Sequence, residues 1–203
     1  MTPLWYYVNV QKQTRRQIKT MSPFQELIAL VPPPEKPIYT GSAETWAESE
    51  EKLGAALPPD YKALVDKYGA GSFADWFRVY NPFVPEGSSN LFSSVTFVSH
   101  HFHEGLRLRP DDMPPFRSFP GTGGLLPWAG DENGGEFCWV TSGPADTWTV
   151  INLDAHYTAE DYRVLNYTAT EFLAGWFAGR ITGDWYPSDL QPTQRRHFTP
   201  LQQ

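Results

Sequence analysis

The chain has 203 residues and a formal net charge of −7 at pH 7. This length suits one domain, because a chain of this size can bury roughly 70% of its unfolded surface without disulfides or metal ions. The excess of acids argues against a nucleic-acid-binding protein, which needs a basic face for phosphates. It would attract a basic protein partner, or only keep the protein in solution.

Residues 1–21 are expected to be an N-terminal extension, without the pattern of a signal peptide. The apolar run Leu4–Val8 is short, and basic residues follow it instead of preceding it. No stretch reaches the length that a membrane span needs. The single cysteine, Cys138, cannot form an internal disulfide and favours a reducing compartment. We therefore expect a cytoplasmic protein with no membrane partner.

Two helices with clear start and stop signals follow this extension. Ser22–Gln25 has the pattern of a capping box with proline at the first helical position, and Pro32–Pro34 stops the helix. Ser42 caps a second helix, which runs to Leu53 and ends at Gly54.

A third helix begins at Pro58–Asp60 and ends at Gly69. Its apolar residues recur at the spacing of one helical face: Tyr61, Leu64, Val65 and Tyr68. After it, Ser72–Tyr80 predicts one strand, and Ser89–Leu106 predicts a further helix. Arg107–Gly124 is rich in proline and glycine and is expected to be a long surface loop.

The segment Gly124–Asp154 reads as three strands joined by turns, which makes a meander with one buried face. Its first turn, Asp131–Gly135, holds most of the polar groups in the first half of the segment. Here Asn133 and Gly134 are expected to supply the positive φ values that a tight hairpin requires.

The last elements are a strand near Tyr162–Leu165 and a helix opened by a second capping box, Thr168–Glu171. The helix is expected to end at Gly183, and its apolar face comprises Phe172, Leu173, Trp176, Phe177 and Ile181. Residues 184–203 show no periodicity and are expected to be a C-terminal tail that is disordered or wraps the surface. Helices followed by a run of strands favour an α+β fold, with a single, mostly antiparallel sheet flanked by helices.

Several of these segments, in this order, resemble the SUKH superfamily, which groups fungal cell-wall-synthesis regulators with bacterial immunity proteins. The resemblance covers roughly residues 42–183 and places one domain at 22–183. It is carried by Leu57–Tyr61, Tyr68–Phe73, Leu126–Ala129 with the acidic glycine turn after it, Phe137–Trp139, Trp148–Ile151 and Phe172–Leu173. It implies a non-catalytic fold that binds another protein, in bacterial members usually a cognate toxin such as a nuclease or deaminase.

Other readings of the polar residues are weaker. Asp131, Glu132, Asn133 and Glu136 begin like a calcium loop but lack its glycine position and distal glutamate, so a turn with solvated acids or a protein-binding patch is favoured. The cluster His100, His101, His103 and Glu104 lacks further ligands nearby for a metal. Cys138 lies in a predicted strand and is expected to be a small buried hydrophobe.

A carbohydrate-active site would need two carboxylates, and the sequence has two neighbouring pairs, Asp111–Asp112 and Glu160–Asp161. Side chains adjacent in sequence diverge, so such pairs do not create the separation that glycosidase chemistry needs.

We therefore expect a non-enzymatic immunity-type protein that needs no cofactor or metal and neutralises a basic toxin domain by occluding its active site. The expected partner-binding acids are Asp111, Asp112, Asp131, Glu132, Glu136 and Asp146. A regulatory or scaffold module of the same fold is the alternative, and a metal-binding or carbohydrate-active protein is least favoured.

Overall fold

The computed structural model describes residues 21–202, and most of the expected N-terminal extension lies outside them. The helices are α2 (Pro23–Leu30), α3 (Ala43–Leu53), α4 (Pro59–Tyr68), α5 (Leu91–Leu108) and α6 (Ala169–Phe177), with short 3-10 turns η1 (Pro110–Asp112) and η2 (Ala145–Thr147). The strands are β1 (Gly71–Phe73), β2 (Phe77–Val79), β3 (Arg117–Ser118), β4 (Gly124–Asp131), β5 (Glu136–Val140), β6 (Thr149–Leu153), β7 (Tyr162–Val164) and β8 (Phe198–Pro200).

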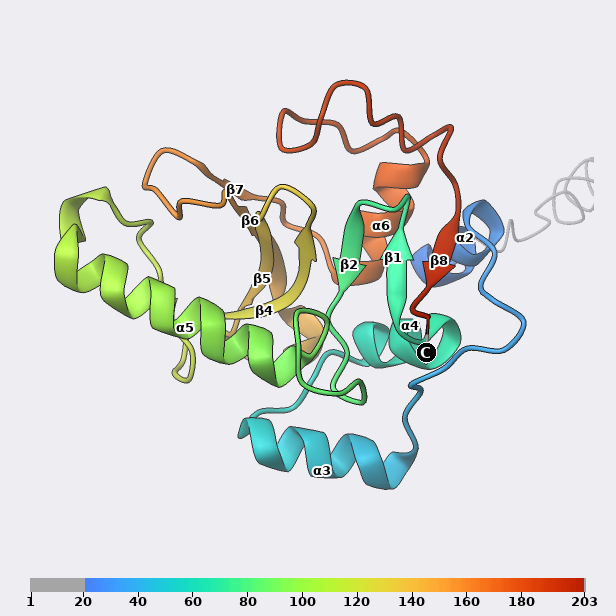
Figure 1. Cartoon of the computed structure of the whole chain (residues 1–203), viewed down its shortest axis with the longest axis horizontal. Coiled ribbons are helices and arrows are strands. Elements are labelled where there is room, and N and C mark those ends of the chain that lie inside the picture. Colours follow the sequence, from blue (N-terminus) through green and yellow to red (C-terminus); the bar gives the residue numbers. More distant parts are fainter. Residues whose placement is uncertain (1–20, 203) are drawn as a thin grey trace, which may run out of the picture.

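All of these strands belong to one sheet, in the order β7-β6-β5-β4-β2-β1-β8 (Figure 1). Every neighbouring pair in this order is antiparallel, while β3 lies parallel to the first residues of β4. The predicted meander is β4, β5 and β6. The structure thus confirms the expected α+β fold with a mostly antiparallel sheet.

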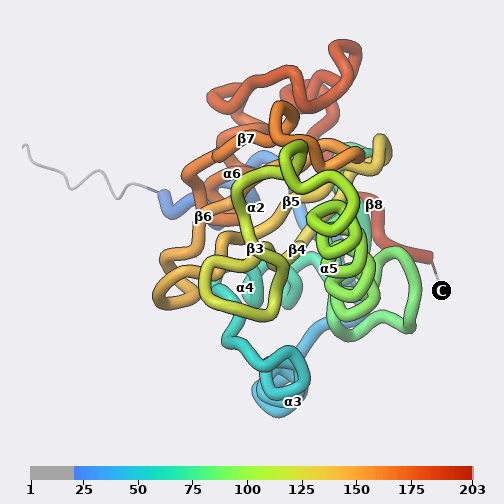
Figure 2. Tube along the Cα trace, turned by 90° about the vertical axis from the view of Figure 1, so that its left-hand side faces the viewer, coloured from blue at the N-terminus to red at the C-terminus, as the bar shows by residue number. Residues whose placement is uncertain are grey.

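Helices cover the two faces of the sheet unequally (Figures 1 and 2). The larger core lies on the face packed by α2, α4 and α6, and alternate residues of β5 point into it, namely Phe137 and Trp139. The smaller core lies under α5, where Val98 and Phe102 of the helix meet Cys138 of β5. This alternation is the two-residue repeat of a strand buried on both faces.

Capping residues explain where the helices start. Ser22 with Gln25, and Thr168 with Glu171, form the two predicted capping boxes. Ser42 caps α3, where Gly54 in the left-handed conformation ends the helix as expected. The apolar stripe of α4 is buried as predicted.

The segment 72–80 is two strands instead of the one predicted. Trp76 donates a hydrogen bond from its N–H to the carbonyl of Phe73, and the two residues between them, Ala74 and Asp75, have φ values of 55° and 54°. Positive φ at both central positions is the geometry of a hairpin turn that usually contains Asn or Gly. The sequence therefore carries no ordinary signal for this turn.

Helix α6 ends at Phe177, earlier than the predicted Gly183. Gly179 has a φ of 76°, and the N–H groups of Arg180 and Ile181 both donate to the carbonyl of Gly175. The chain therefore folds back on the last turn of the helix. This brings Ile181 against Gly175, where an added Cβ would lie 2.6 Å from the isoleucine Cδ1.

The segment 107–124 is less irregular than expected. Helix α5 continues to Leu108, η1 follows, and β3 joins the sheet before the buried Phe119.

Residues 184–202 contribute to the sheet and the core. Trp185 and Leu190 are buried in the larger core, and β8 pairs with β1 at the edge of the sheet. In Figure 1 this segment, in red, arches over one end of the sheet before it returns along β1.

Candidate functional site

The turn between β4 and β5 is organised by the side chain of Asp131. Its Oδ1 accepts the N–H of Asn133 at 2.8 Å and the N–H of Gly135 at 2.9 Å. Gly134 alone has positive φ in this turn, at 86°, so the expectation for Asn133 was wrong. Burial of the Asp131 carboxyl raises its pKa, and these hydrogen bonds offset only part of that effect.

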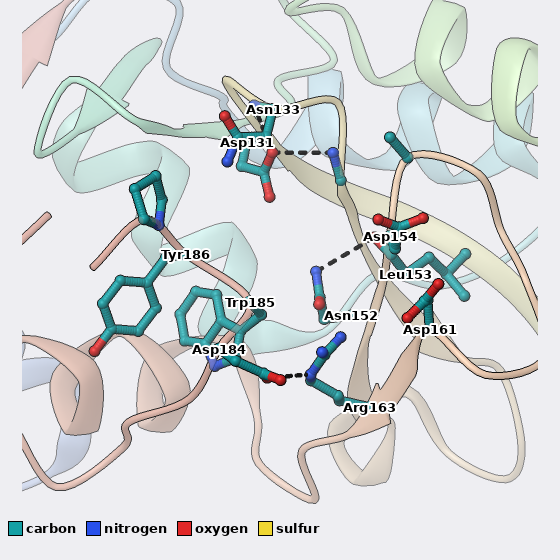
Figure 3. A pocket seen from close by; sticks show the side chains of 13 residues that line it. Asp131, Asn133, Asn152, Leu153, Asp154, Asp161, Arg163, Asp184, Trp185 and Tyr186 are labelled. Carbon is teal, nitrogen blue, oxygen red and sulfur yellow. Dashed lines mark hydrogen bonds and ion pairs between the residues drawn. The ribbon is translucent and has the colours of Figure 1, made fainter. Parts of the chain in front are cut away.

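A polar pocket of about 270 Å³ opens beside this turn, and Figure 3 shows its lining. We call it the acidic pocket. Three segments distant in sequence build it: the β4–β5 turn, the ends of β6 and β7 with the loop between them, and residues 184–187. Its charged residues are Asp131, Asp154, Asp161, Asp184 and Arg163.

The charges of the acidic pocket do not cancel. Arg163 donates from Nε to Asp184 at 2.8 Å. The other three carboxylates of the lining, Asp131, Asp154 and Asp161, have no arginine or lysine partner within the lining. Burial raises the pKa of Asp154, but hydrogen bonds from the backbone and ring of His156 outweigh it and hold that pKa below its usual value. Asp161 accepts the hydroxyl of Thr158 at 2.9 Å.

An aromatic wall closes the opposite side of the acidic pocket. Trp185 and Tyr186 line it, and the ring of Trp185 packs on Phe137 and Phe172 at centroid distances of 5.4 and 5.3 Å. A cavity with carboxylates on one side and aromatic rings on the other suits a basic side chain, whose stem packs on the rings while its charge meets the acids.

Glu136 is not part of this acidic surface. It is 6% exposed and lies at the start of β5, where Tyr80 donates its hydroxyl to Glu136 Oε2 at 2.8 Å. The expectation that Glu136 is a solvated acid was therefore wrong. The sequence predicts an exposed side chain for a strand residue that directly follows a polar turn. The burial of Glu136 becomes visible only in the structure, where β5 pairs with β4 and α5 packs over this face of the sheet.

The structure does not bring the other predicted acids together. Asp131 and the exposed Glu132 share one turn, and Glu132 forms an ion pair with Arg78. Asp146, in η2, lies at the opposite end of β5 from that turn, since η2 follows Val140. Asp111 and Asp112 are exposed in η1, where Asp112 pairs with Arg109 at 2.9 Å.

Sequence reasoning missed Asp154, Asp161 and Asp184 in the acidic pocket. A signal for Asp154 was present, because antiparallel β6 runs back toward the β4–β5 turn and Asp154 is the first residue after it. For Asp184 there was none, because nothing local places residues 184–187 against the sheet.

The histidine cluster considered for metal binding and Cys138, considered for nucleophilic chemistry, are not in the lining of the acidic pocket, whereas Asp131 and Asn133 of the calcium-like turn are. His100, His101 and His103 are exposed on α5, and Glu104 of that cluster pairs with Arg107 at 2.7 Å. Between residues 21 and 202, no three His, Cys, Asp or Glu side chains are placed to hold a metal ion. Cys138 is buried as predicted, and burial raises the pKa of its thiol.

In the part of the chain that the structure describes, each helix is too short or too polar to cross a bilayer.

Comparison with protein-family models gives a match. A family model described as SUKH_6, SMI1-KNR4 cell-wall, matches residues 43–173, from α3 into α6. No curated protein and no solved structure matched the chain. The matched segment is more than half of the sequence and contains α3, α4, α5, the first residues of α6 and most of the sheet. Proteins of the SUKH superfamily are generally non-catalytic, and membership indicates a protein-interaction module at the level of the family. The match shows that the chain belongs to this superfamily.

Proposed function

We propose that this protein is an immunity-type module that neutralises a basic toxin domain by binding over its active site. The observation that carries the proposal is the acidic pocket, in which Asp131, Asp154 and Asp161 face the aromatic wall of Trp185 and Tyr186. Carboxylates beside aromatic rings are suited to a cationic protein patch.

The proposed mechanism needs no chemical step. A net charge of −7 attracts a basic partner over long range and speeds association. Affinity then comes from side chains that enter the acidic pocket and lose water, while the surrounding surface covers the substrate groove of the toxin.

A second candidate is a regulatory module that binds another cellular protein. The family description, which names SMI1-KNR4 and the cell wall, favours it. Both candidates use the same kind of interaction, and they differ in the partner.

The test is co-elution of the purified full-length chain with the toxin domain encoded beside its gene. We expect a stable complex in which the double variant Asp154→Asn/Asp161→Asn weakens binding at least tenfold and lowers its sensitivity to salt. The matched control is Glu48→Gln/Glu51→Gln, which removes two exposed charges on the distant α3 and is expected to bind normally.

The results separate the candidates. Absence of any complex with neighbouring gene products contradicts the immunity role. An equal loss of affinity in the control and the Asp154/Asp161 variant contradicts the acidic pocket as the docking site.

A further inference from the structure

A second pocket lies on the other face of the sheet, beneath the first half of α5. Its volume is about 300 Å³, and its lining is mainly apolar. We call it the Glu136 pocket, and it is lined by Arg78, Tyr80, Ser93, Ser94, Phe97, Asp131 and Glu136 together with the glycines of the turn. Asp131 also lines the acidic pocket, so the β4–β5 turn separates the two cavities.

The Glu136 carboxyl is the buried polar group of this pocket. The side chain is 6% exposed, and its Oε2 accepts the Tyr80 hydroxyl at 2.8 Å. Within residues 21–202, its Oε1 accepts no hydrogen bond. Glu136 Oε1 is not among the fully buried polar atoms that lack a partner, so it is open to the cavity that the residue lines. A ligand in this cavity therefore has a free acceptor oxygen on an otherwise buried side chain.

The backbone is shaped around this arrangement. Gly130 pairs with Glu136 across β4 and β5, and a Cβ at residue 130 would lie 2.2 Å from the Tyr80 hydroxyl. The Tyr80 ring therefore reaches Glu136 only because residue 130 has no side chain. The Tyr80 carbonyl in turn accepts the Tyr61 hydroxyl at 2.5 Å, which fixes Tyr80 to α4.

The pocket also offers surface for an aliphatic stem and a flat cation. Phe97 is 53% exposed although it lines the cavity, and Ser93 and Ser94 present hydroxyl groups from the same helix. A guanidinium group stacks on aromatic faces and donates to carboxylates in a planar fork, which a lysine ammonium cannot do.

We propose that the Glu136 pocket receives an arginine side chain of the protein partner, with the guanidinium donating to Glu136 and its stem packed along Phe97. This proposal rests on the proposed function, because it assigns one anchoring residue to the basic partner. It places that anchor on the α5 face, next to the acidic pocket.

Insertion of this cation is coupled to a proton. Burial raises the pKa of Glu136 to about 8, the Tyr80 hydrogen bond lowers it, and the charge of Asp131 raises it further. The other titratable groups facing Glu136 are Tyr80, Cys138 and Tyr157, whose pKa values are all raised mainly by burial. Arg78 of β2 is engaged by Glu132, and α5 contributes no charged residue to the pocket lining.

The test uses n-butylguanidinium, which mimics an arginine side chain and keeps its charge at every pH used. Binding to the full-length protein is followed by NMR of the Glu136 carboxyl carbon and the amides of Ser93 and Ser94. We expect saturable binding that is roughly 50-fold or more tighter at pH 8.5 than at pH 6, because only the ionised carboxyl pairs with the cation. The neutral isostere n-butylurea is expected to bind at least tenfold more weakly at pH 8.5.

Two variants and a control locate the binding. Glu136→Gln removes the pH dependence and most of the affinity, and Phe97→Ala, at an exposed position, weakens binding several-fold without a folding defect. Glu51→Gln removes one exposed charge from the distant α3 and leaves binding within twofold of the wild type. The proposal is overturned if n-butylurea binds as tightly as n-butylguanidinium. It is also overturned if Phe97→Ala and folded Glu136→Gln bind like the wild type, or if the NMR shift changes are confined to the acidic pocket.

This test needs no partner protein. Failure with n-butylguanidinium leaves complex formation with the toxin domain untouched, whereas absence of a complex leaves the cation binding intact. The two proposals can therefore fail separately.

Discussion

The carboxylate of Asp60 joins the start of α4 to the start of α6 across 110 residues of sequence. Its Oδ2 accepts both the backbone N–H of Thr170 at 2.9 Å and the Thr170 hydroxyl at 3.1 Å. The N–H groups of a first helical turn have no partner within the helix, so Asp60 supplements the cap that Thr168 provides from within α6.

Asp60→Ala is therefore expected to lower the free energy of unfolding by about 1–3 kcal/mol, since it leaves two partly buried donors of Thr170 without an acceptor. Asp60→Asn retains one acceptor oxygen and should cost less. Urea denaturation measures both, with Glu51→Ala on the exposed face of α3 as the control. Equal stability of Asp60→Ala and the control contradicts the capping role.

The turn between β1 and β2 is supported by the C-terminal segment. Asp75 accepts hydrogen bonds from His197 Nε2 at 2.8 Å and from the Thr199 hydroxyl at 2.5 Å, while Ala74 donates its N–H to the carbonyl of His197. Two non-glycine residues thus keep positive φ because distant residues hold them there.

We predict the stability order wild type, then Asp75→Gly, then Asp75→Ala. Both substitutions remove the bonds to His197 and Thr199, but only alanine retains the strain of positive φ, which costs about 1 kcal/mol. Thermal unfolding of the three proteins tests the order. A more stable Asp75→Ala than Asp75→Gly would show that backbone strain is negligible in this turn.

Hydrogen bonds from Thr199 and His197 also lower the pKa of Asp75. A carboxyl with a lowered folded-state pKa contributes stability above its unfolded pKa, and this contribution is lost as the pH falls through the folded value. The destabilisation by Asp75→Asn is therefore expected to be larger at pH 7 than at pH 3. Because Asp75 is exposed, the effect is small, and chemical denaturation at the two pH values measures it.

Glu136 gives the opposite dependence on pH. Its folded-state pKa of about 8 lies above the ordinary value of 4.5, so the native state binds more protons than the unfolded state between these values. This contribution to stability is present below pH 4.5 and declines as the pH rises to about 8, with a limiting slope of about 1.4 kcal/mol per pH unit.

The stability of Glu136→Gln relative to the wild type is therefore expected to increase from pH 5 to pH 8. Denaturation curves of both proteins across this range measure the difference in their free energies of unfolding. Titratable groups that both proteins share contribute equally and do not affect this difference. Glu132→Gln serves as the control and should show no such trend of comparable size. A constant difference between wild type and Glu136→Gln would mean that Glu136 titrates normally.

Local signals were sufficient for the parts of the fold that local chemistry determines. Ser22, Ser42 and Thr168 each carry a capping pattern within three residues, and the stripe of α4 has a simple period. The meander was also predictable, because its strands are consecutive and joined by short turns.

Features stabilised by distant residues were not predictable in this way. The hairpin turn at Ala74–Asp75 depends on His197 and Thr199, and the acidic pocket depends on Asp184 and its neighbours. The burial of Glu136 depends on α5 and on Tyr80. In each case the sequence holds the residues, but their contacts arise only from tertiary packing.

The last strand is expected to protect the edge of the sheet. Phe198 of β8 packs against Tyr68 and Phe73 at centroid distances of 5.2 and 4.9 Å, and β8 covers the outer edge of β1. Truncation after Arg196 should therefore destabilise the protein by about 3 kcal/mol or more through loss of aromatic packing, and it should expose a pairing edge that promotes self-association. Truncation after Leu201 is the control, because Leu201 still donates its N–H to Ala70. Thermal unfolding and light scattering measure both effects, and a monomeric Arg196 truncation with wild-type stability would contradict the role assigned to β8.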